Sequence, residues 1–331
     1  MNVSIKEIAR RLKISPSTVS RALQNHPRIG LRTKERVQEL AEQLNYIPSA
    51  TARNLRSGKT FMLGVVLPEI RENFFSNAIN GIEELAFENG YTVALYQSHD
   101  RYDRERQVLE VLSHQLVDGV ILSVAKESRQ FDHVEKLLRH RIPLVLFDRI
   151  PPGIETHQVS CDIESGAYEA TRLLIQKGFR KIALLNGPDS LVACEERYQG
   201  YRRALMEGGL PEVPGLIQQV DLTTEDTRWK MEGLLSLDQL PDSVLTFNDY
   251  VALDAMGVCR SRGLRINQDI SFVSFSNLPM NAYLEHPPLA SVEQHPYRMG
   301  YSAAEILLRA IGNREEAAQK LVLQPELMVL S

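Results

Sequence analysis

Short apolar runs alternate with amphipathic segments along the chain from Phe61 onward. The first apolar runs occupy residues 61–67, 92–97, 119–124 and 143–148, and helical patterns separate them around residues 78–88, 104–116 and 131–140. Alternation of this kind builds parallel sheets with helices on both faces. The sequence therefore predicts an α/β fold with a doubly wound parallel sheet.

A second series of the same kind follows, with apolar runs at residues 157–162, 181–187, 216–221, 243–248 and 270–275 and helical patterns around 166–177, 194–207, 225–235 and 250–262. Two series predict two lobes, and the elements near residues 289–294, 297–311 and 320–330 are expected to cross between them. We assign residues 61–161 and 291–319 to an N-terminal lobe, and residues 162–290 and 320–331 to a C-terminal lobe. Ligands bind outside the carboxyl ends of strands in such sheets, so two facing lobes predict a cleft for a small molecule.

The first 47 residues carry a helical pattern instead. Apolar residues spaced three and four apart predict a helix that starts after Ser4, and Ser15 with Pro16 fits the cap and first position of a second helix. A third helix over residues 30–44 closes a small core. Because the second helix presents short polar side chains and Arg21 on its outer face, the pattern is typical of a helix-turn-helix that enters the major groove of DNA. The alternative is a helical bundle without a DNA-binding role.

The charge distribution favours DNA binding. Residues 1–60 contain twelve Lys and Arg and four Asp and Glu, a net charge of +8, whereas the remaining residues carry a net charge of −12. Phosphates attract the basic head and are repelled by the acidic body. Residues 48–60 join the two parts. They are interpreted either as a flexible linker or as a hinge helix that folds on binding DNA.

The composition excludes several other classes of protein. No run approaches the ~20 apolar residues of a membrane span, and the charged, amphipathic N-terminus is unlike a secretory signal, so a cytoplasmic protein without membrane partners is expected. Cys161, Cys194 and Cys259 form no C-x-x-C pair, which indicates reduced, buried thiols. The histidines lack metal-binding spacing. We expect neither a metal nor a cofactor.

The sequence resembles the lactose-repressor/galactose-repressor (LacI/GalR) family of bacterial transcription factors over essentially its whole length. The resemblance rests on the segments SPSTVSRAL and LNYIPSATARNL in the head, and on Asn73-Phe74-Phe75, Phe147-Asp148-Arg149, Arg197 to Tyr201 and Asn248-Asp249 in the body. It implies a helix-turn-helix head, a hinge helix and a two-lobed body like that of periplasmic binding proteins. It also implies a nucleoid-associated repressor that binds double-stranded, palindromic operator DNA.

The resemblance assigns roles to individual residues of the head and the hinge. Pro16, Ser17 and Arg21 are expected at base edges, and Thr18 and Ser20 near phosphates. Ala52, Leu55 and Arg56 of the hinge are expected at a central base step. The full expected DNA-binding set is Ser4, Ser15, Pro16, Ser17, Thr18, Ser20, Arg21, Arg28, Ala52, Leu55 and Arg56.

The resemblance also implies an effector site in the cleft, and the chemistry of its residues suits the hydroxyls and apolar face of a sugar-like molecule. The expected residues are Phe74, Phe75, Ser123, Asp148, Arg149, Arg197, Asn248, Asp249, Ser276 and Gln294. Structural roles are the alternative: Phe74 and Phe75 as core, Asp249 as a helix cap, and Asp148 with Arg149 as an internal ion pair. Where relatives often carry an aspartate, this chain has Ser276.

Two further classes of protein are alternatives to a regulator. A solute-binding protein shares the fold of the body, but the basic head and the absence of a signal peptide speak against it. An enzyme is disfavoured because the sequence shows no nucleophile with a partner base, no metal-binding set and no phosphate-binding loop. The chain ends at Ser331 without a leucine heptad that would join dimers into tetramers, so a homodimer is expected.

Overall fold

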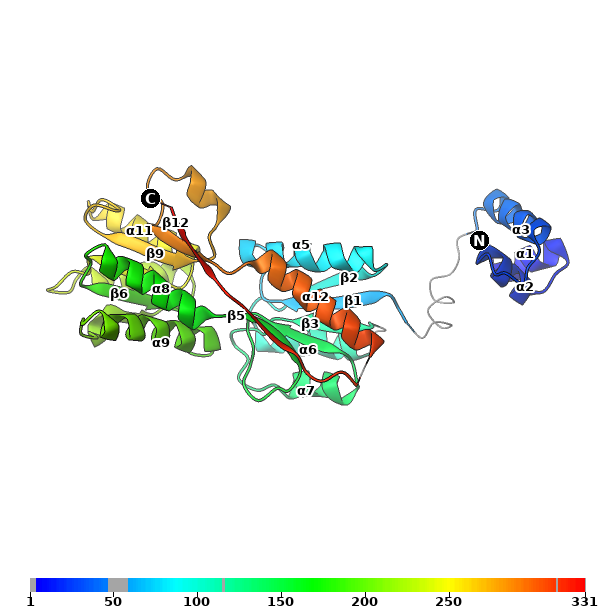
Figure 1. The fold of residues 1–331 in the computed structure, drawn as a ribbon, viewed down its shortest axis with the longest axis horizontal. Helices are drawn as coiled ribbons and strands as arrows, with labels where there is room; N and C mark the ends of the chain where they lie inside the picture. The colour runs from blue at the N-terminus through cyan, green and yellow to red at the C-terminus, as the bar shows by residue number, and fades with distance from the viewer. Residues whose placement is uncertain (1–3, 47–58, 115–116, 314, 331) are drawn as a thin grey trace. The chain divides into compact units, whose positions relative to one another are not determined.

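The computed structural model describes residues 4–46, 59–114, 117–313 and 315–330 (Figure 1). The chain divides by its contacts into a head, residues 1–60, and a body, residues 61–331. The predicted hinge residues Ala52, Leu55 and Arg56 lie outside the described residues.

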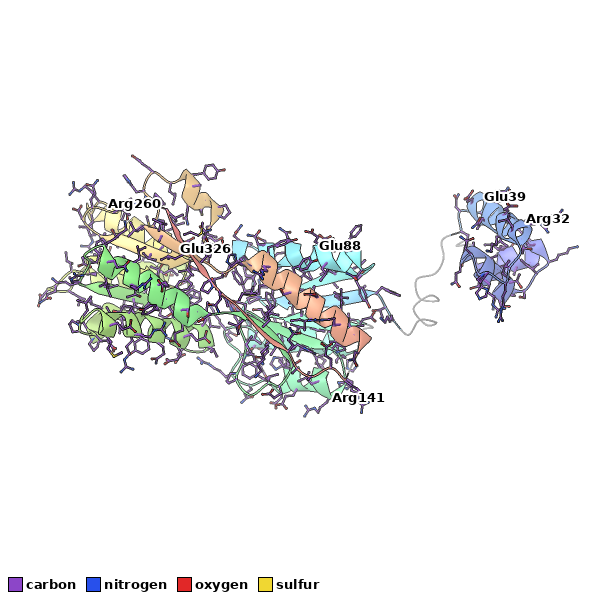
Figure 2. All side chains as sticks on the ribbon, in the orientation of Figure 1. Arg32, Glu39, Glu88, Arg141, Arg260 and Glu326 are labelled. Carbon is purple, nitrogen blue, oxygen red and sulfur yellow. The ribbon has the colours of Figure 1, made fainter. Side chains whose placement is uncertain are left out.

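The head is a three-helix unit with its own core. Its helices are α1 (Ile5–Leu12), α2 (Pro16–Leu23) and α3 (Leu31–Gln43). The core consists of apolar side chains from all three helices, namely Ile8, Ala9, Val19, Ala22, Val37 and Ala41. Arg32 and Glu39 lie on the exposed side of α3 (Figure 2). The spacing of apolar residues thus predicted these helices correctly, because each one buries a single stripe.

The first lobe of the body is built on a parallel sheet with the strand order β11-β5-β4-β3-β1-β2. Its strands are β1 (Met62–Leu67), β2 (Thr92–Gln97), β3 (Gly119–Leu122), β4 (Leu144–Phe147), β5 (His157–Cys161) and β11 (Lys320–Leu323). The helices of this lobe are α5 (Asn73–Glu88), α6 (Tyr102–His114), α7 (Asp132–Arg139) and α12 (Pro296–Gly312). Strands β3 and β4 are buried along their whole length, as expected for a sheet covered on both faces.

The second lobe repeats this plan with the strand order β12-β10-β9-β8-β6-β7. Its strands are β6 (Ile182–Asn186), β7 (Ile217–Gln219), β8 (Ser243–Thr246), β9 (Ser271–Phe275), β10 (Ala290–Glu293) and β12 (Glu326–Val329), and β12 alone pairs antiparallel. Its helices are α8 (Ile163–Gln176), α9 (Val192–Glu207), α10 (Thr224–Leu234) and α11 (Asp249–Ser261), with short 3-10 turns at Pro214–Leu216 and Pro279–Tyr283. The two lobes confirm the predicted fold class.

The strand pairings correct the predicted division of the body. Strand β10 was placed in the N-terminal lobe from residue 291 onward, but it pairs in parallel with β9 of the second sheet. Strand β11 was placed in the C-terminal lobe, but it pairs in parallel with β5 of the first sheet. The final extended stretch is therefore two strands in different sheets, separated by Gln324 and Pro325. Proline has no N–H to donate to a ladder and interrupts the pairing at this point.

One pair of helices in each lobe packs closely through glycine. A Cβ atom added to Gly81 of α5 would lie 2.1 Å from the carbonyl oxygen of Tyr297 in α12. A Cβ atom added to Gly200 of α9 would lie 2.1 Å from the carbonyl oxygen of Glu164 in α8. Figure 1 shows α5 beside α12 and α8 beside α9. The absence of a side chain at these two positions sets the distance between the helices.

We predict that Gly200→Ala destabilises the protein, because the added methyl group overlaps the backbone of α8. The free energy of unfolding should fall by about 1–3 kcal/mol or more, as in other overpacked cores. Gly257→Ala in α11 is the matched control, because no atom lies within 4 Å of a Cβ added there. Alanine should leave stability unchanged or raise it by up to about 1 kcal/mol at this control position. Equal effects in urea denaturation would contradict the close packing.

Candidate DNA-binding surface and ligand pocket

The start of α2 is organised by the hydroxyl group of Ser15. Its Oγ accepts a hydrogen bond from the backbone N–H of Thr18 at 3.0 Å, and it lies 2.7 Å from the Oγ of Ser17 and 2.8 Å from the Oγ1 of Thr18. Pro16 occupies the first helical turn, where no N–H is needed. Ser4 differs from Ser15. It lies at the cap position of α1, but its side chain makes no capping hydrogen bond.

Arg21 is exposed on the outer side of α2, opposite the buried Val19 and Ala22. Its guanidinium makes no ion pair with any described residue, so it is available to a ligand. The other predicted DNA-binding residues among those described are exposed or half-buried, and these are Ser4, Ser15, Pro16, Ser17, Thr18, Ser20 and Arg28. The head therefore presents a polar, basic surface around α2.

A pocket between the two lobes brings together loops that follow the carboxyl ends of strands in both sheets. The space in this pocket, together with the open solvent at its mouth, is about 740 Å³. Residues of the first lobe in its wall include Glu72, Phe74, Phe75, Val124, Phe131, Asp148 and Arg149, and residues of the second lobe include Leu191, Arg197, Phe247, Asn248 and Ser276. Gln294, just after β10, also lines it.

Two of the predicted effector residues do not line this pocket. Ser123 is fully buried beneath the pocket. Asp249 is also fully buried. The other eight predicted residues, Phe74, Phe75, Asp148, Arg149, Arg197, Asn248, Ser276 and Gln294, all lie in the pocket wall.

Asp249 is a structural residue of the second lobe. One carboxylate oxygen accepts hydrogen bonds from the hydroxyl groups of Ser274 and Ser291, the latter at 2.9 Å. The other oxygen accepts from the backbone N–H of Leu278 at 2.7 Å and from the side-chain amide of Asn281 at 2.9 Å. With both oxygens occupied, Asp249 ties β9 and β10 to the following turn. The cap of α11 is instead Asn248, whose Oδ1 accepts from Val251 N–H at 3.0 Å.

Asp148 is a largely buried carboxylate in the first-lobe wall, with a side chain that is 19% exposed. Burial raises its pKa from 3.8 to about 6, although the nearby Arg149 and Arg197 oppose this shift. Nε of Arg149 lies 3.9 Å from Oδ2 of Asp148, and Nη1 of Arg149 forms a short ion pair with Asp100. The charge of Arg149 is thus balanced within its own lobe. Burial likewise raises the pKa of Glu72 at the edge of the pocket.

Arg197 has no such partner. Its side chain is 2% exposed, and its guanidinium lies 4.5 Å from the ring centre of Phe247 and 4.3 Å from that of Phe275. One terminal nitrogen donates weakly to Asn186 Oδ1 at 3.3 Å and to the carbonyl oxygen of Ala193 at 3.2 Å. Nε has no partner, and no described carboxylate forms an ion pair with the group. Burial lowers the pKa of Arg197, because the charged form is poorly solvated.

Phe74 and Phe75 serve both the core and the pocket. Helix α5 begins at Asn73, five residues before the predicted start, so both rings lie in its first turn. They meet edge to face with their centres 5.2 Å apart, and the guanidinium of Arg149 lies 5.6 Å from the ring centre of Phe75. A role in the core and a role in the effector site are therefore compatible for these residues, because the same rings are buried in the first lobe and line the pocket.

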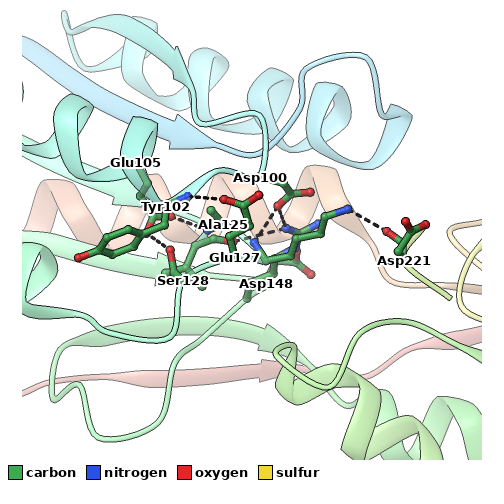
Figure 3. A network of polar contacts seen from close by, with 11 residues as sticks. Asp100, Tyr102, Glu105, Ala125, Glu127, Ser128, Asp148 and Asp221 are labelled. Atoms are coloured by element: carbon green, nitrogen blue, oxygen red, sulfur yellow. Dashed lines mark hydrogen bonds and ion pairs between the residues drawn. The ribbon is translucent and has the colours of Figure 1, made fainter. Parts of the chain in front are cut away.

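Polar contacts connect the pocket to the interface between the lobes. Asp100 accepts from Arg149 and, at 2.9 Å, from the backbone N–H of Lys126 (Figure 3). The Nζ of Lys126 donates across the cleft to the carbonyl oxygen of Asp221 at 2.8 Å.

Nearby, Glu105 holds the same loop, because its carboxylate accepts a hydrogen bond from the backbone N–H of Ala125 at 2.5 Å. Arg129 also pairs across the cleft with Asp189 at 3.1 Å. A change at Arg149 is thus positioned to affect the contact between the lobes.

The sequence interpretation missed several residues of the pocket, most of them apolar. Ile150, Pro151 and Pro152 follow directly after Arg149, and Ser190, Leu191, Val192 and Ala193 lie between β6 and the first turn of α9. They come after the carboxyl ends of β4 and β6, where ligands bind in sheets of this kind, whereas the resemblance named only Asp148 and Arg149 in the first of these loops. The rule alone does not say which residues of a loop turn inward.

Other kinds of site receive no support within the described ranges. No cluster of three or more His, Cys, Asp or Glu side chains there is arranged to hold a metal ion. Cys161, Cys194 and Cys259 are buried and unpaired, as predicted, and burial raises the pKa of Cys161 and of Cys259 to about 12. None of the helices in the described part of the chain has the length and apolar character needed to cross a membrane.

Two family models match the chain. Residues 4–49 match the model for bacterial regulatory proteins of the lacI family. Residues 60–328 match the model for periplasmic binding proteins and the sugar-binding domain of the LacI family. A similar curated protein is the HTH-type transcriptional repressor PurR of Vibrio campbellii (strain ATCC BAA-1116), which is 31% identical over 327 residues, 98% of this chain and 97% of the relative.

Solved structures give the same result for the fold. The transcriptional regulator CelR in complex with cellobiose is 27% identical, with a TM-score of 0.76 over 99% of both chains. The lac repressor dimer bound to operator and the anti-inducer ONPF is 22% identical, with a TM-score of 0.86 over 99% of this chain and 98% of that chain. The head and the body are thus found together in known structures.

We predict that Asp148→Asn stabilises the ligand-free protein at neutral pH. Because burial raises the pKa of Asp148 from 3.8 to about 6, the ionised carboxylate destabilises the fold. This cost is absent below pH 3.8, grows between pH 3.8 and about 6, and is complete above that range. The variant should therefore gain up to about 3 kcal/mol above pH 6 and progressively less as the pH falls.

Thermal unfolding across this pH range measures the effect. Asp238→Asn, at an exposed turn of the second lobe, is the matched control and should show no such pH-dependent gain. A gain for Asp148→Asn that is independent of pH would contradict an ionisation penalty.

Proposed function

The chain belongs to the LacI family of bacterial regulatory proteins, and from that premise we infer that it is a DNA-binding transcriptional repressor switched by a small molecule. The observation that carries this proposal is the combination of a basic helix-turn-helix head with a body whose polar pocket lies between two lobes. The known relatives are repressors rather than enzymes, and the protein acts by binding.

The head binds operator DNA through α2. Pro16, Ser17 and Arg21 contact base edges, with Arg21 on guanine, because arginine to guanine is the commonest specific contact in the major groove. Thr18 and Ser20, together with Ser4, Ser15 and Arg28, lie near the DNA backbone. This assignment is supported by the exposure of these side chains and by the absence of an ion-pair partner for Arg21 among the described residues. The hinge residues Ala52, Leu55 and Arg56 are assigned to the central base step on the resemblance alone.

The protein binds its operator as a homodimer. One α2 helix contacts too few base pairs to select a single site in a genome, so specificity requires a second head at a fixed spacing. A dimer also matches a palindromic operator, in which each half-site meets one head.

The effector binds in the pocket between the lobes, where it contacts both of them at once. Aromatic rings of Phe74 and Phe75 suit the apolar face of a sugar-like ring, and the Asp148 carboxylate suits its hydroxyl groups. A ligand that contacts both lobes favours one relative position of the lobes over others. That preference is the means by which occupancy of the pocket changes the affinity for DNA.

We predict that Arg21→Ala weakens binding to an operator obtained by selection from random DNA. Loss of one bidentate base contact should cost about 1–3 kcal/mol, roughly five- to 150-fold in affinity, with a smaller change on random duplex DNA. Arg36→Ala, which removes one exposed positive charge from α3, is the matched control. It should weaken binding to both DNAs by similar, small factors. Equal weakening of operator and random DNA by Arg21→Ala would contradict base reading by Arg21.

The switch is tested separately. A small molecule that raises the melting temperature of the full chain should also change its operator affinity, as measured by fluorescence anisotropy. Stabilising ligands that leave operator affinity unchanged would contradict an effector-controlled repressor.

A further inference from the structure

The two walls of the pocket differ in how their charges are balanced. In the first lobe, Arg149 pairs with Asp100 and Asp148, the two carboxylates labelled in Figure 3. Glu72 also interacts with Arg149, so carboxylates outnumber the cation. Among the described residues, the wall contributed by the second lobe contains Arg197 and no carboxylate. A ligand that spans the two walls thus meets excess negative charge on one side and a positive charge on the other.

No described carboxylate of α9 forms an ion pair with Arg197, although Glu196 is close enough to favour its charged form. Glu195, two residues before Arg197 in α9, accepts a hydrogen bond from Gln199 at 2.5 Å instead. Glu196, the direct neighbour, forms no ion pair with any described residue. Burial of a guanidinium that is 2% exposed and forms no ion pair with a carboxylate destabilises the protein, unless a ligand supplies the missing negative charge.

The side chain is held in a fixed position despite this cost. Phe247 and Phe275 lie against the guanidinium at 4.5 and 4.3 Å, and Asn186 and the carbonyl of Ala193 orient one terminal nitrogen. Arg197 is therefore preorganised, and its free donors are available at the pocket wall. Such a planar, fixed donor group suits a carboxylate or phosphate.

Ser276 adds to this difference between the walls. It follows β9 and lines the same pocket as Arg197, so a carboxylate at this position would add negative charge to the second-lobe wall. A hydroxyl group there leaves the positive potential intact, and it also removes the repulsion that an anionic ligand would meet.

We propose that the effector is an anionic sugar derivative, whose acidic group binds Arg197 while its hydroxyl groups donate to Asp148 on the opposite wall. This inference rests on the proposed function of the pocket and specifies the class of ligand. A neutral sugar satisfies the first-lobe wall but leaves Arg197 without a counter-charge. The acidic group is a carboxylate, as in uronic and aldonic acids, or a phosphate, as in sugar phosphates.

Matched pairs of ligands test the proposal on the full chain. Glucose is compared with glucuronate, gluconate and glucose 6-phosphate, and galactose with galacturonate and galactonate, by thermal shift and then by calorimetric titration. At least one anionic member should raise the melting temperature, and its neutral parent should bind roughly thirtyfold more weakly or not at all, because the parent leaves a buried charge unpaired. The carboxylate and phosphate arms identify the acidic group.

Variants of the pocket test the role of Arg197 directly. Arg197→Met should abolish the preference for the anion over its neutral parent, whereas Arg197→Lys should keep part of it. Arg197→Met also removes a buried charge, so its melting temperature without ligand should not fall, which separates loss of binding from loss of folding. Ser276→Asp should weaken binding of the anion and spare the neutral parent. Arg202→Lys, an exposed residue of α9 paired with Glu212, is the control and should bind like the wild type.

Two results would overturn the proposal: a neutral sugar that binds as tightly as its anionic counterpart, or a panel in which no anionic sugar binds. Operator affinity, measured in parallel, keeps this outcome distinct from failure of the proposed function. A neutral sugar that binds and changes operator affinity would leave the repressor switch intact and refute only the anionic class. Bound ligands without any effect on operator affinity would instead refute the switch.

Discussion

The chain passes between the two sheets of the body three times, and the position of the pocket depends on these crossings. It leaves the first sheet after β5, returns after β10 to form α12, and crosses again between β11 and β12. Each sheet has an edge strand, β11 in the first lobe and β12 in the second, that the chain forms only after it has passed through the other lobe. The lobes are thus joined on one side, and the carboxyl ends of their central strands face each other across the pocket. Gln294 lies directly after β10 at one of these crossings and lines the pocket.

The charges in the pocket follow from this arrangement. Each lobe supplies one buried arginine, and among the described residues only the arginine of the first lobe forms an ion pair with a carboxylate. Arg149 is fixed by Asp100, which also holds the loop of Lys126, and Lys126 reaches the second lobe. Arg197 is fixed by aromatic rings and carries an unbalanced charge. A ligand that satisfies Arg197 while contacting Asp148 would therefore act on both lobes, which is the physical link between binding and a change in their relative position.

Most of the fold was predictable from the sequence, because periodic apolar residues at Ile8, Val19 and Val37 mark buried helix faces and short apolar runs mark buried strands. The predictions failed where a tertiary contact decides the outcome. Helix α5 begins before the predicted residue because the chain near Asn73 is held by packing and not by a capping side chain. The resemblance placed Asp249 in the effector site, yet its carboxylate accepts hydrogen bonds from four donors that are distant in sequence and is buried inside the second lobe. The partners of β10 and β11 depend on pairing between remote segments, which local patterns do not encode.

The central claim is that the relative position of the lobes controls DNA binding, and a covalent link between them tests it without a ligand. Lys126→Cys and Asp221→Cys place thiols where Lys126 now donates to the carbonyl oxygen of Asp221, and a short bismaleimide joins them. The unlinked double variant and the singly labelled Lys126→Cys variant are the controls. We predict that the operator affinity of the linked protein, measured by fluorescence anisotropy, differs from that of both controls by about fivefold or more. Equal operator affinities for linked and unlinked protein would contradict the account.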